Sequence, residues 1–215
     1  MPPLRVEIWS DVVCPWCYVG KRRFEKALEA FEHRDDVEVR WRSFQLDPHA
    51  PPERAGSSAE HLAAKYGMTV VQAEQTNAQM TELAAGEGLE YHLDRTRGGN
   101  SFHAHRLIQL AADHGVQDAM KERLMRAYFT EGEAVGDRET LIRLADEVGL
   151  DARETLNGDA YADTVNADVE LAHRIGIRGV PYFVLDRRYG VSGAQPAELL
   201  LQALDKAWEA RTAAA

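Results

Sequence analysis

The two cysteines of the chain, Cys14 and Cys17, lie three positions apart. If the second were placed at random, about one arrangement in a hundred would give this spacing, so the pair is informative by itself. Thiols at this spacing can exchange a disulfide or bind a metal. Structural zinc takes four protein ligands, and an all-cysteine iron–sulfur cluster needs more than two cysteines, so dithiol chemistry is favoured. A metal site completed by His103 and His105 is the alternative.

The residues around the pair place it at the start of a helix. Apolar and polar residues alternate over 4–9, which predicts a strand, and helical spacing over 15–31 predicts a helix. A thiol at a helix start faces unpaired backbone N–H groups that favour the thiolate, so we expect the pKa of Cys14 below its free value of about 8.5. Cys14 is therefore predicted to attack, and Cys17 to resolve the mixed disulfide.

Other residues of this helix are assigned supporting roles. Pro15 and Trp16 lie between the cysteines, and we expect them to set the geometry of the helix end and so the preference for the reduced form. Pro15 suits the first helical turn, because its missing N–H would be unpaired there. Lys21, Arg22 and Arg23 are expected on a solvated face, where screening limits their influence on the thiols.

The rest of the chain predicts further strands and a long helical stretch. A strand is expected over 37–44, joined in parallel to the first strand through the helix. From 48 to 176 the apolar spacing is helical almost throughout, with five or six helices. Strands over 180–185 and 189–192 form an antiparallel hairpin, and Pro196 opens a last helix.

This order of elements predicts an α/β fold in two parts. Residues 1–47 and 177–215 are expected to form one domain, and residues 48–176 an inserted α-helical subdomain. The insert has no low-complexity linker and no internal repeat, so we expect it to pack on the domain that carries it.

Composition and charge limit the partners. The chain has 25 basic and 35 acidic residues, and its net charge of -10 disfavours nucleic acid and anionic lipid. Its apolar runs are far shorter than the roughly 18 residues needed to cross a membrane, so no membrane association is expected. The first residues lack the basic and apolar regions of a secretion signal, and we therefore expect a cytoplasmic protein.

Three parts of the sequence resemble the DsbA-type thioredoxin-fold proteins and, within them, the FrnE-like subgroup. The matching stretches are WSDVVCPWCYVG at 9–20, NSFHAHRL at 100–107, and GVPYF at 179–183 with GAQP at 193–196. The resemblance implies a thioredoxin-like fold with an inserted α-helical subdomain, and a thiol:disulfide oxidoreductase acting through Cys14 and Cys17. The cysteine stretch and the GVPYF stretch are the specific parts of the match.

The resemblance also implies a substrate-binding surface around the cysteines. It implies a cis peptide bond between Val180 and Pro181 that faces the pair, with the backbone of Val180 holding an extended substrate segment. Pro15 and Trp16 would contact the substrate beside it. Without the resemblance, Pro181 is simply the first residue of a strand, where proline is tolerated.

The partners expected on this basis are thiols and disulfides. The substrate is a protein, a peptide or a small molecule, and no cofactor is expected beyond the redox-active disulfide, with glutathione as an optional co-substrate. Some FrnE-like proteins carry a second cysteine pair near the C-terminus, and this chain has none, so an external reductant or oxidant must regenerate it. A homodimer, the direction of electron flow and the redox potential are left open.

Two other functions are retained as alternatives. The related 2-hydroxychromene-2-carboxylate isomerases use glutathione but typically carry serine at the first cysteine position, which Cys14 argues against. Ala194 and Gln195, before the last helix, are candidates to bind a glutathione carboxylate, with plain helix capping favoured. The second alternative is a chaperone-like binding module, whose activity would need neither thiol.

Overall fold

The computed structural model describes residues 2–213 and divides the chain into two compact units. The first unit comprises Met1–Leu46 and Asn166–Ala215, and the second comprises Asp47–Val165. The family resemblance and the pattern of elements both predicted an α/β thioredoxin-like fold with a helical insertion, and the structure confirms this class.

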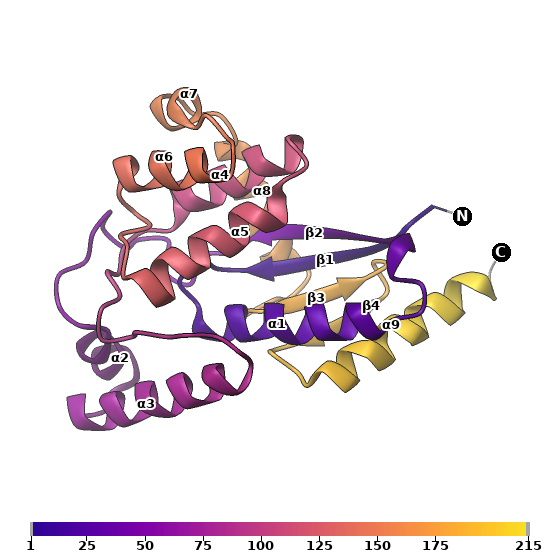
Figure 1. The fold of residues 1–215 in the computed structure, drawn as a ribbon, viewed down its shortest axis with the longest axis horizontal. Helices are drawn as coiled ribbons and strands as arrows, with labels where there is room; N and C mark the ends of the chain where they lie inside the picture. Colours follow the sequence, from indigo (N-terminus) through magenta and orange to yellow (C-terminus); the bar gives the residue numbers. More distant parts are fainter. Residues whose placement is uncertain (1, 214–215) are drawn as a thin grey trace. The chain divides into compact units, whose positions relative to one another are not determined.

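A four-stranded mixed sheet forms the centre of the first unit (Figure 1). Its strands lie in the order β2-β1-β3-β4, with bounds Leu4–Ser10 for β1, Val37–Ser43 for β2, Tyr182–Leu185 for β3 and Tyr189–Ser192 for β4. β1 pairs in parallel with β2, which follows it through α1 (Pro15–Ala30) and the short 3₁₀-helix η1 (Arg34–Asp36). β3 pairs antiparallel with β4, which confirms the predicted hairpin, and it also pairs antiparallel with β1.

Alternation along the strands separates the side chains of this sheet into two faces. One face carries Phe183, whose ring packs on Phe24 of α1 with centroids 5.6 Å apart. On this side α1 and α9 (Ala197–Thr212) contact each other along the sheet (Figure 1). The other face carries Trp9, which belongs to an apolar cluster with Ala172 and Ile177. The Phe24–Phe183 contact thus packs α1 directly on β3.

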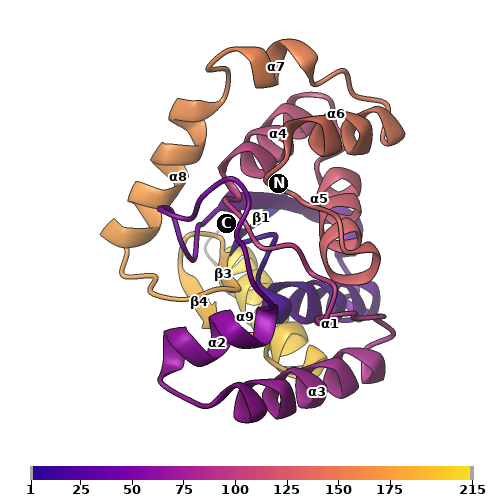
Figure 2. The ribbon, with the colours of Figure 1, turned by 90° about the vertical axis from the view of Figure 1, so that its left-hand side faces the viewer.

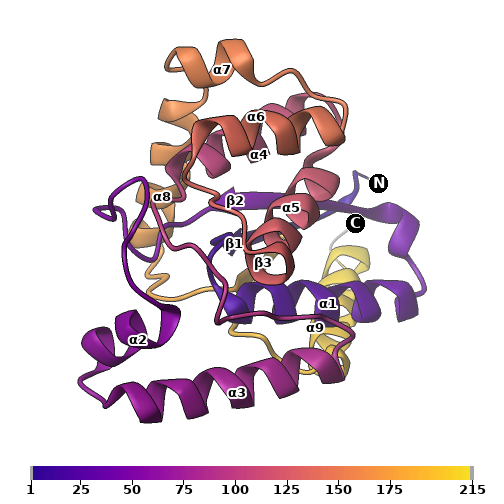
Figure 3. The same cartoon turned by 60° about the vertical axis from the view of Figure 1, so that its left-hand side comes forward.

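The second unit is helical (Figure 3). Its elements are α2 (Ser58–Tyr66), α3 (Val70–Gly86), α4 (Phe102–Asp113), α5 (Gln117–Arg126), the π-helical turn η2 (Ala127–Glu131), α6 (Arg138–Glu147) and α7 (Arg153–Asn157). Ser57 and Thr69 form the capping boxes that start α2 and α3, and Asp137 caps α6. Together with α8 (Ala162–Arg174), residues 48–176, all described, hold seven α-helices rather than the five or six expected, because α7 is only five residues long.

The boundary between the units lies earlier than the sequence indicated. We placed the end of the insert at 176, where the helical pattern stops, but the units separate after Val165, within α8 (Figure 2). Asp168 explains the difference, because its buried carboxylate accepts hydrogen bonds from Arg42 Nη1 at 2.8 Å and from the Ser43 N–H at 3.0 Å. The second half of α8 is therefore tied to β2.

Within residues 2–213, no helix combines the length and the apolar character that crossing a membrane would require.

Candidate dithiol site

Cys14 occupies the N-cap position of α1. Its backbone is extended, with φ -94° and ψ 115°, and Pro15 follows at the first helical position as predicted. The Cys17 N–H donates a 3.0 Å hydrogen bond to the Cys14 carbonyl, which closes the first turn. Both cysteines are free thiols, with Cys14 4% exposed and Cys17 fully buried. Of the two residues, only Cys14 has any surface in contact with solvent.

The segment before β3 reaches the same thiol. The Val180–Pro181 peptide bond is cis, the geometry that the resemblance implied. The Cys14 thiol donates a hydrogen bond to the Val180 carbonyl oxygen, with 3.6 Å between sulfur and oxygen. Pro181 is buried against Gly20, where an added Cβ would lie only 2.7 Å from the proline Cγ. A glycine at this position therefore allows α1 to approach the loop.

The pKa of Cys14 differs in direction from the prediction. The hydrogen bond with the Cys17 side chain, burial, and repulsion from charge on Cys17 raise the pKa of the Cys14 thiol well above its usual value. The Cys17 N–H at the helix end does lower the pKa of Cys14, as expected, but this effect is smaller than the three that raise it. Two adjacent buried sulfurs cannot both carry a negative charge, so the pair titrates as a unit.

Two charged residues near the start of α1 differ from what the sequence indicated: Asp11 was not singled out, and Lys21 was placed on the wrong kind of surface. Asp11 is buried, and its Oδ2 accepts the Leu46 N–H at 2.8 Å; the charge of this carboxylate contributes to the raised pKa of Cys14. Lys21, expected on a solvated face, has a side chain only 2% exposed and forms an ion pair with Glu25. That expectation was wrong because apolar spacing alone does not show which turns of α1 are covered.

Trp16 provides an apolar surface next to the thiols. Its side chain is 45% exposed, whereas Tyr18 and Val19 on the following turn are buried. Large apolar groups left in solvent beside a reactive group are typical of surfaces that receive a partner. The assignment of Pro15, Trp16, Val180 and Pro181 as substrate contacts stays a prediction.

The loop before α9 is organised by its own hydrogen bonds. Gln195 Nε2 donates to the Ser192 carbonyl at 2.8 Å, and Arg23 Nη1 donates to the Ala194 carbonyl at 2.6 Å. Pro196 occupies the N-cap position of α9 without a side-chain cap. The Gln195 amide and the Ala194 carbonyl are thus already engaged in holding the loop.

The two histidines of the metal alternative have structural roles in the helical unit. His105 is buried on α4, and the His103 Nδ1 lies 3.1 Å from an Arg106 nitrogen. Burial and the nearby charge of Arg106 lower the pKa of His103. Across residues 2–213, the structure shows no group of three histidine, cysteine or acidic side chains placed to hold a metal ion.

A parallel β1–α1–β2 unit, an antiparallel hairpin, and a dithiol at the start of α1 facing a cis-proline loop define a thioredoxin-like dithiol protein. Residues 5–205 match the model of the DSBA-like thioredoxin domain, and the chain belongs to this family. The assignment to the FrnE-like subgroup stays a prediction.

Three solved structures illustrate the similarity. A probable DsbA oxidoreductase from Streptomyces coelicolor is 49% identical, with a TM-score of 0.91 over 96% of this chain and 90% of that one. The cytosolic disulfide reductase DsbM from Pseudomonas aeruginosa, solved with GSH, is 20% identical, with a TM-score of 0.64 over 97% and 98%. A 2-hydroxychromene-2-carboxylate isomerase is 16% identical, with a TM-score of 0.72 over 98% and 99%. The last two show likeness of fold alone.

Proposed function

We propose that the chain is a thiol:disulfide oxidoreductase in which Cys14 is the nucleophile and Cys17 the resolving thiol. The observation that carries the proposal is the position of Cys14 at the N-cap of α1, where its sulfur touches the Val180 carbonyl and lies next to the exposed Trp16. Cys17 is fully buried one turn later, where it can reach Cys14 but not an external partner. The match to the DSBA-like family supports the same chemistry.

The exchange proceeds in two balanced steps. The Cys14 thiolate attacks one sulfur of a substrate disulfide, which forms a mixed disulfide and releases the other substrate sulfur as a thiolate. Cys17 then loses its proton and attacks the Cys14 sulfur, which frees the second substrate thiolate and leaves a Cys14–Cys17 disulfide. The substrate gains two electrons and the protein loses two. In the opposite direction, the protein disulfide oxidises a substrate dithiol.

Regeneration needs a partner from outside the chain. The two cysteines supply one redox pair, so a thiol such as glutathione must reduce the disulfide, or an external disulfide must oxidise the dithiol. The glutathione-bound DsbM structure supports glutathione as such a partner at the level of fold. We place this exchange in the cytoplasm, where glutathione keeps thiols reduced.

The test compares exchange rates in wild type and three single variants. Reduction of insulin and of glutathione disulfide is followed for wild type, Cys14→Ser and Cys17→Ser, with Trp16→Ala to probe the substrate surface. We expect Cys14→Ser to lose the activity and Cys17→Ser to stop after one mixed disulfide. Equal rates in wild type and Cys14→Ser would reject the nucleophile assignment.

The same variants separate the two alternatives. A glutathione-dependent isomerase should bind glutathione tightly and keep its activity in Cys17→Ser, since that reaction needs no resolving thiol. A chaperone-like module should protect unfolded protein from aggregation after both thiols are removed. Either outcome, together with absent disulfide exchange, would replace the oxidoreductase proposal.

A further inference from the structure

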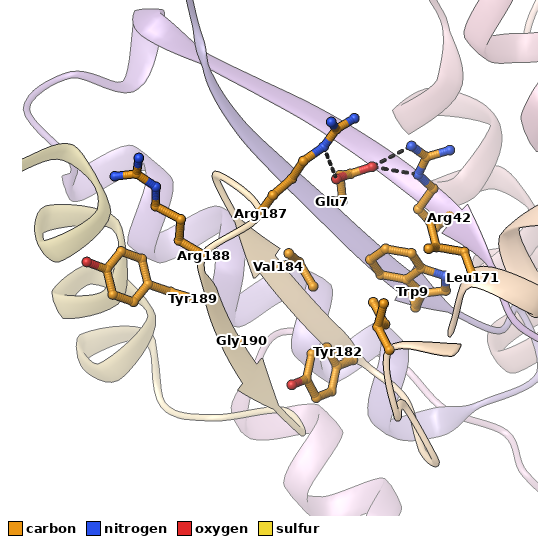
Figure 4. A pocket seen from close by; sticks show the side chains of 11 residues that line it. Glu7, Trp9, Arg42, Leu171, Tyr182, Val184, Arg187, Arg188, Tyr189 and Gly190 are labelled. Carbon is orange, nitrogen blue, oxygen red and sulfur yellow. Dashed lines mark hydrogen bonds and ion pairs between the residues drawn. The ribbon is translucent and has the colours of Figure 1, made fainter. Parts of the chain in front are cut away.

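A hollow is present on the sheet face that does not carry α1. Trp9, Tyr182 and Val184 point to this face, and Leu171 of α8 lies beside them (Figure 4). Ile175, just after α8, also lines the hollow. Together with Arg187 these residues define a hollow of about 520 Å³, which we call the Trp9 pocket. This volume is in the range of small-molecule sites, about 300–1,000 Å³. Because Phe183 and Pro181 face α1, the pocket and the dithiol use opposite faces of the sheet.

The inner wall of the Trp9 pocket is apolar. The Trp9 indole N–H donates to the Asp168 carbonyl at 3.0 Å, so the ring has no free donor left for a ligand. Leu171, Tyr182 and Val184 pack against the same cluster while remaining partly exposed. Such a wall favours the flat hydrocarbon face of a ligand over a polar one.

The rim of the pocket is basic although the chain as a whole is acidic. Arg42, Arg187 and Arg188 line it with one carboxylate, that of Glu7, so the lining carries an excess of positive charge in a chain of net charge -10. Arg42 Nε donates to Glu7 Oε1 at 2.9 Å, and this pair is mostly buried. The same guanidinium also pairs with Asp168, so Arg42 is shared by two buried carboxylates, and Arg187 adds an exposed positive charge near Glu7.

Arg187 is the residue whose guanidinium group can pair with a ligand. Its Nε lies 3.7 Å from Glu7 Oε2, and its side chain is 70% exposed, so this ion pair contributes little. Figure 4 shows Arg187 above Glu7 and Arg188 beside Tyr189. Within residues 2–213, Arg188 has no carboxylate partner. Two guanidinium groups at the same turn can thus rotate toward an anion.

The backbone of the turn is a separate observation that points to the same residues. Asp186 and Arg187 have φ values of 50° and 57°, in the left-handed region where hairpin turns usually place glycine or asparagine. These backbone angles belong to the turn between β3 and β4, and they place the Arg187 side chain near Glu7.

We propose that the Trp9 pocket binds a small aromatic carboxylate. The ring of the ligand lies on the partly exposed side chains of Leu171, Tyr182 and Val184, which cover the buried Trp9. Its carboxylate pairs with the exposed guanidinium groups of Arg187 and Arg188. Binding is non-covalent, and it requires neither cysteine.

The experiment measures binding of 2-naphthoate and of its uncharged analogue naphthalene-2-carboxamide by calorimetry. The variants are the double substitution Arg187→Gln/Arg188→Gln, the pocket-filling Val184→Trp, and Arg34→Gln as an exposed arginine outside the pocket. Thermal melting and disulfide exchange are recorded for each protein, so that a folding defect is recognised separately.

We expect naphthoate to bind wild type at least about tenfold more tightly than the amide, because charge-assisted hydrogen bonds are the stronger ones. The double variant should lose about tenfold for naphthoate and nothing for the amide, Val184→Trp should weaken both, and Arg34→Gln neither. The proposal is overturned by no binding, by equal affinity for the two probes, or by a double variant that still binds naphthoate as wild type does. If Val184→Trp does not fold, the double variant at the exposed turn decides the matter.

Discussion

Gly20 lies where α1 comes closest to the loop that carries Pro181, and an alanine there tests whether this approach positions the dithiol. The added Cβ would sit 2.7 Å from Pro181 Cγ and 3.5 Å from Ala194 Cβ. Carbon atoms in contact prefer about 3.5–4.0 Å, so α1 and the loop must separate by roughly 1 Å. The contact between the Cys14 sulfur and the Val180 carbonyl, 3.6 Å now, would open with it.

The magnitude follows from two opposing contributions. Overpacking of a buried site costs about 1–3 kcal/mol, and alanine in a helix gains about 1 kcal/mol over glycine. We therefore expect Gly20→Ala to lower the free energy of unfolding by about 1 kcal/mol. A displacement of this size beside reacting atoms should also slow disulfide exchange by about tenfold or more.

Gly86 provides a matched control for this substitution. It ends α3, and a Cβ added there would meet no other heavy atom within 4 Å. Gly86→Ala should therefore raise stability by up to about 1 kcal/mol and leave exchange unchanged. Urea denaturation followed by circular dichroism, with the exchange rate measured on the same samples, gives both quantities. A Gly20→Ala protein that is as stable and as fast as wild type would refute the packing argument.

Two further predictions concern stability. Asp168→Asn removes one of the two buried carboxylates that share Arg42, the other being Glu7, and should lower the free energy of unfolding by about 1–3 kcal/mol in chemical denaturation. Asp163→Asn on the exposed side of α8 should change it by less than about 0.5 kcal/mol, and equal effects of the two substitutions would contradict the tie between Asp168 and β2. Asp137→Ala should cost about 1 kcal/mol at pH 7, because the Asp137 carboxylate accepts the Thr140 N–H at 2.8 Å, which lowers its pKa. Because the pKa of Asp137 is lower in the folded state than its unfolded value of about 3.9, the carboxylate stabilises the fold above that pH and stops doing so as pH falls through the folded pKa. The difference in unfolding free energy between wild type and Asp137→Ala should therefore narrow below about pH 4. A difference that stays constant down to pH 2.5 would contradict this explanation.

Most elements of the fold could be predicted because their signals are local. The strand 4–9, the helix from Pro15 and the hairpin at 182–192 each follow from periodicity and turn residues over a few positions. The capping boxes at Ser57 and Thr69 are equally local, and both are formed. The end of the insert was misplaced since it depends on what Asp168 contacts across more than a hundred residues of sequence.

The candidate site was predictable in its residues but not in its electrostatics. The spacing of the cysteines and the proline after Cys14 indicated a thiol at a helix start, and the structure places it there. The direction of the pKa shift was missed because burial and the side chain of Cys17 outweigh the helix end, and burial is a tertiary property. Lys21 was misassigned for the same reason. The turn that contains Arg187 was predicted from the sequence. The ion pair between Arg187 and Glu7 was not, because it depends on which strands lie side by side in the sheet.

The most direct test of the central claim is to identify which sulfur an external disulfide reaches. Cys17→Ala and Cys14→Ala are each incubated with excess glutathione disulfide, and adduct formation is followed over time by intact-mass spectrometry. The account predicts a single adduct that forms on Cys14 in Cys17→Ala, and reaction slower by at least about tenfold in Cys14→Ala, where the remaining sulfur is fully buried. Adduct formation at the same rate in Cys14→Ala would contradict it.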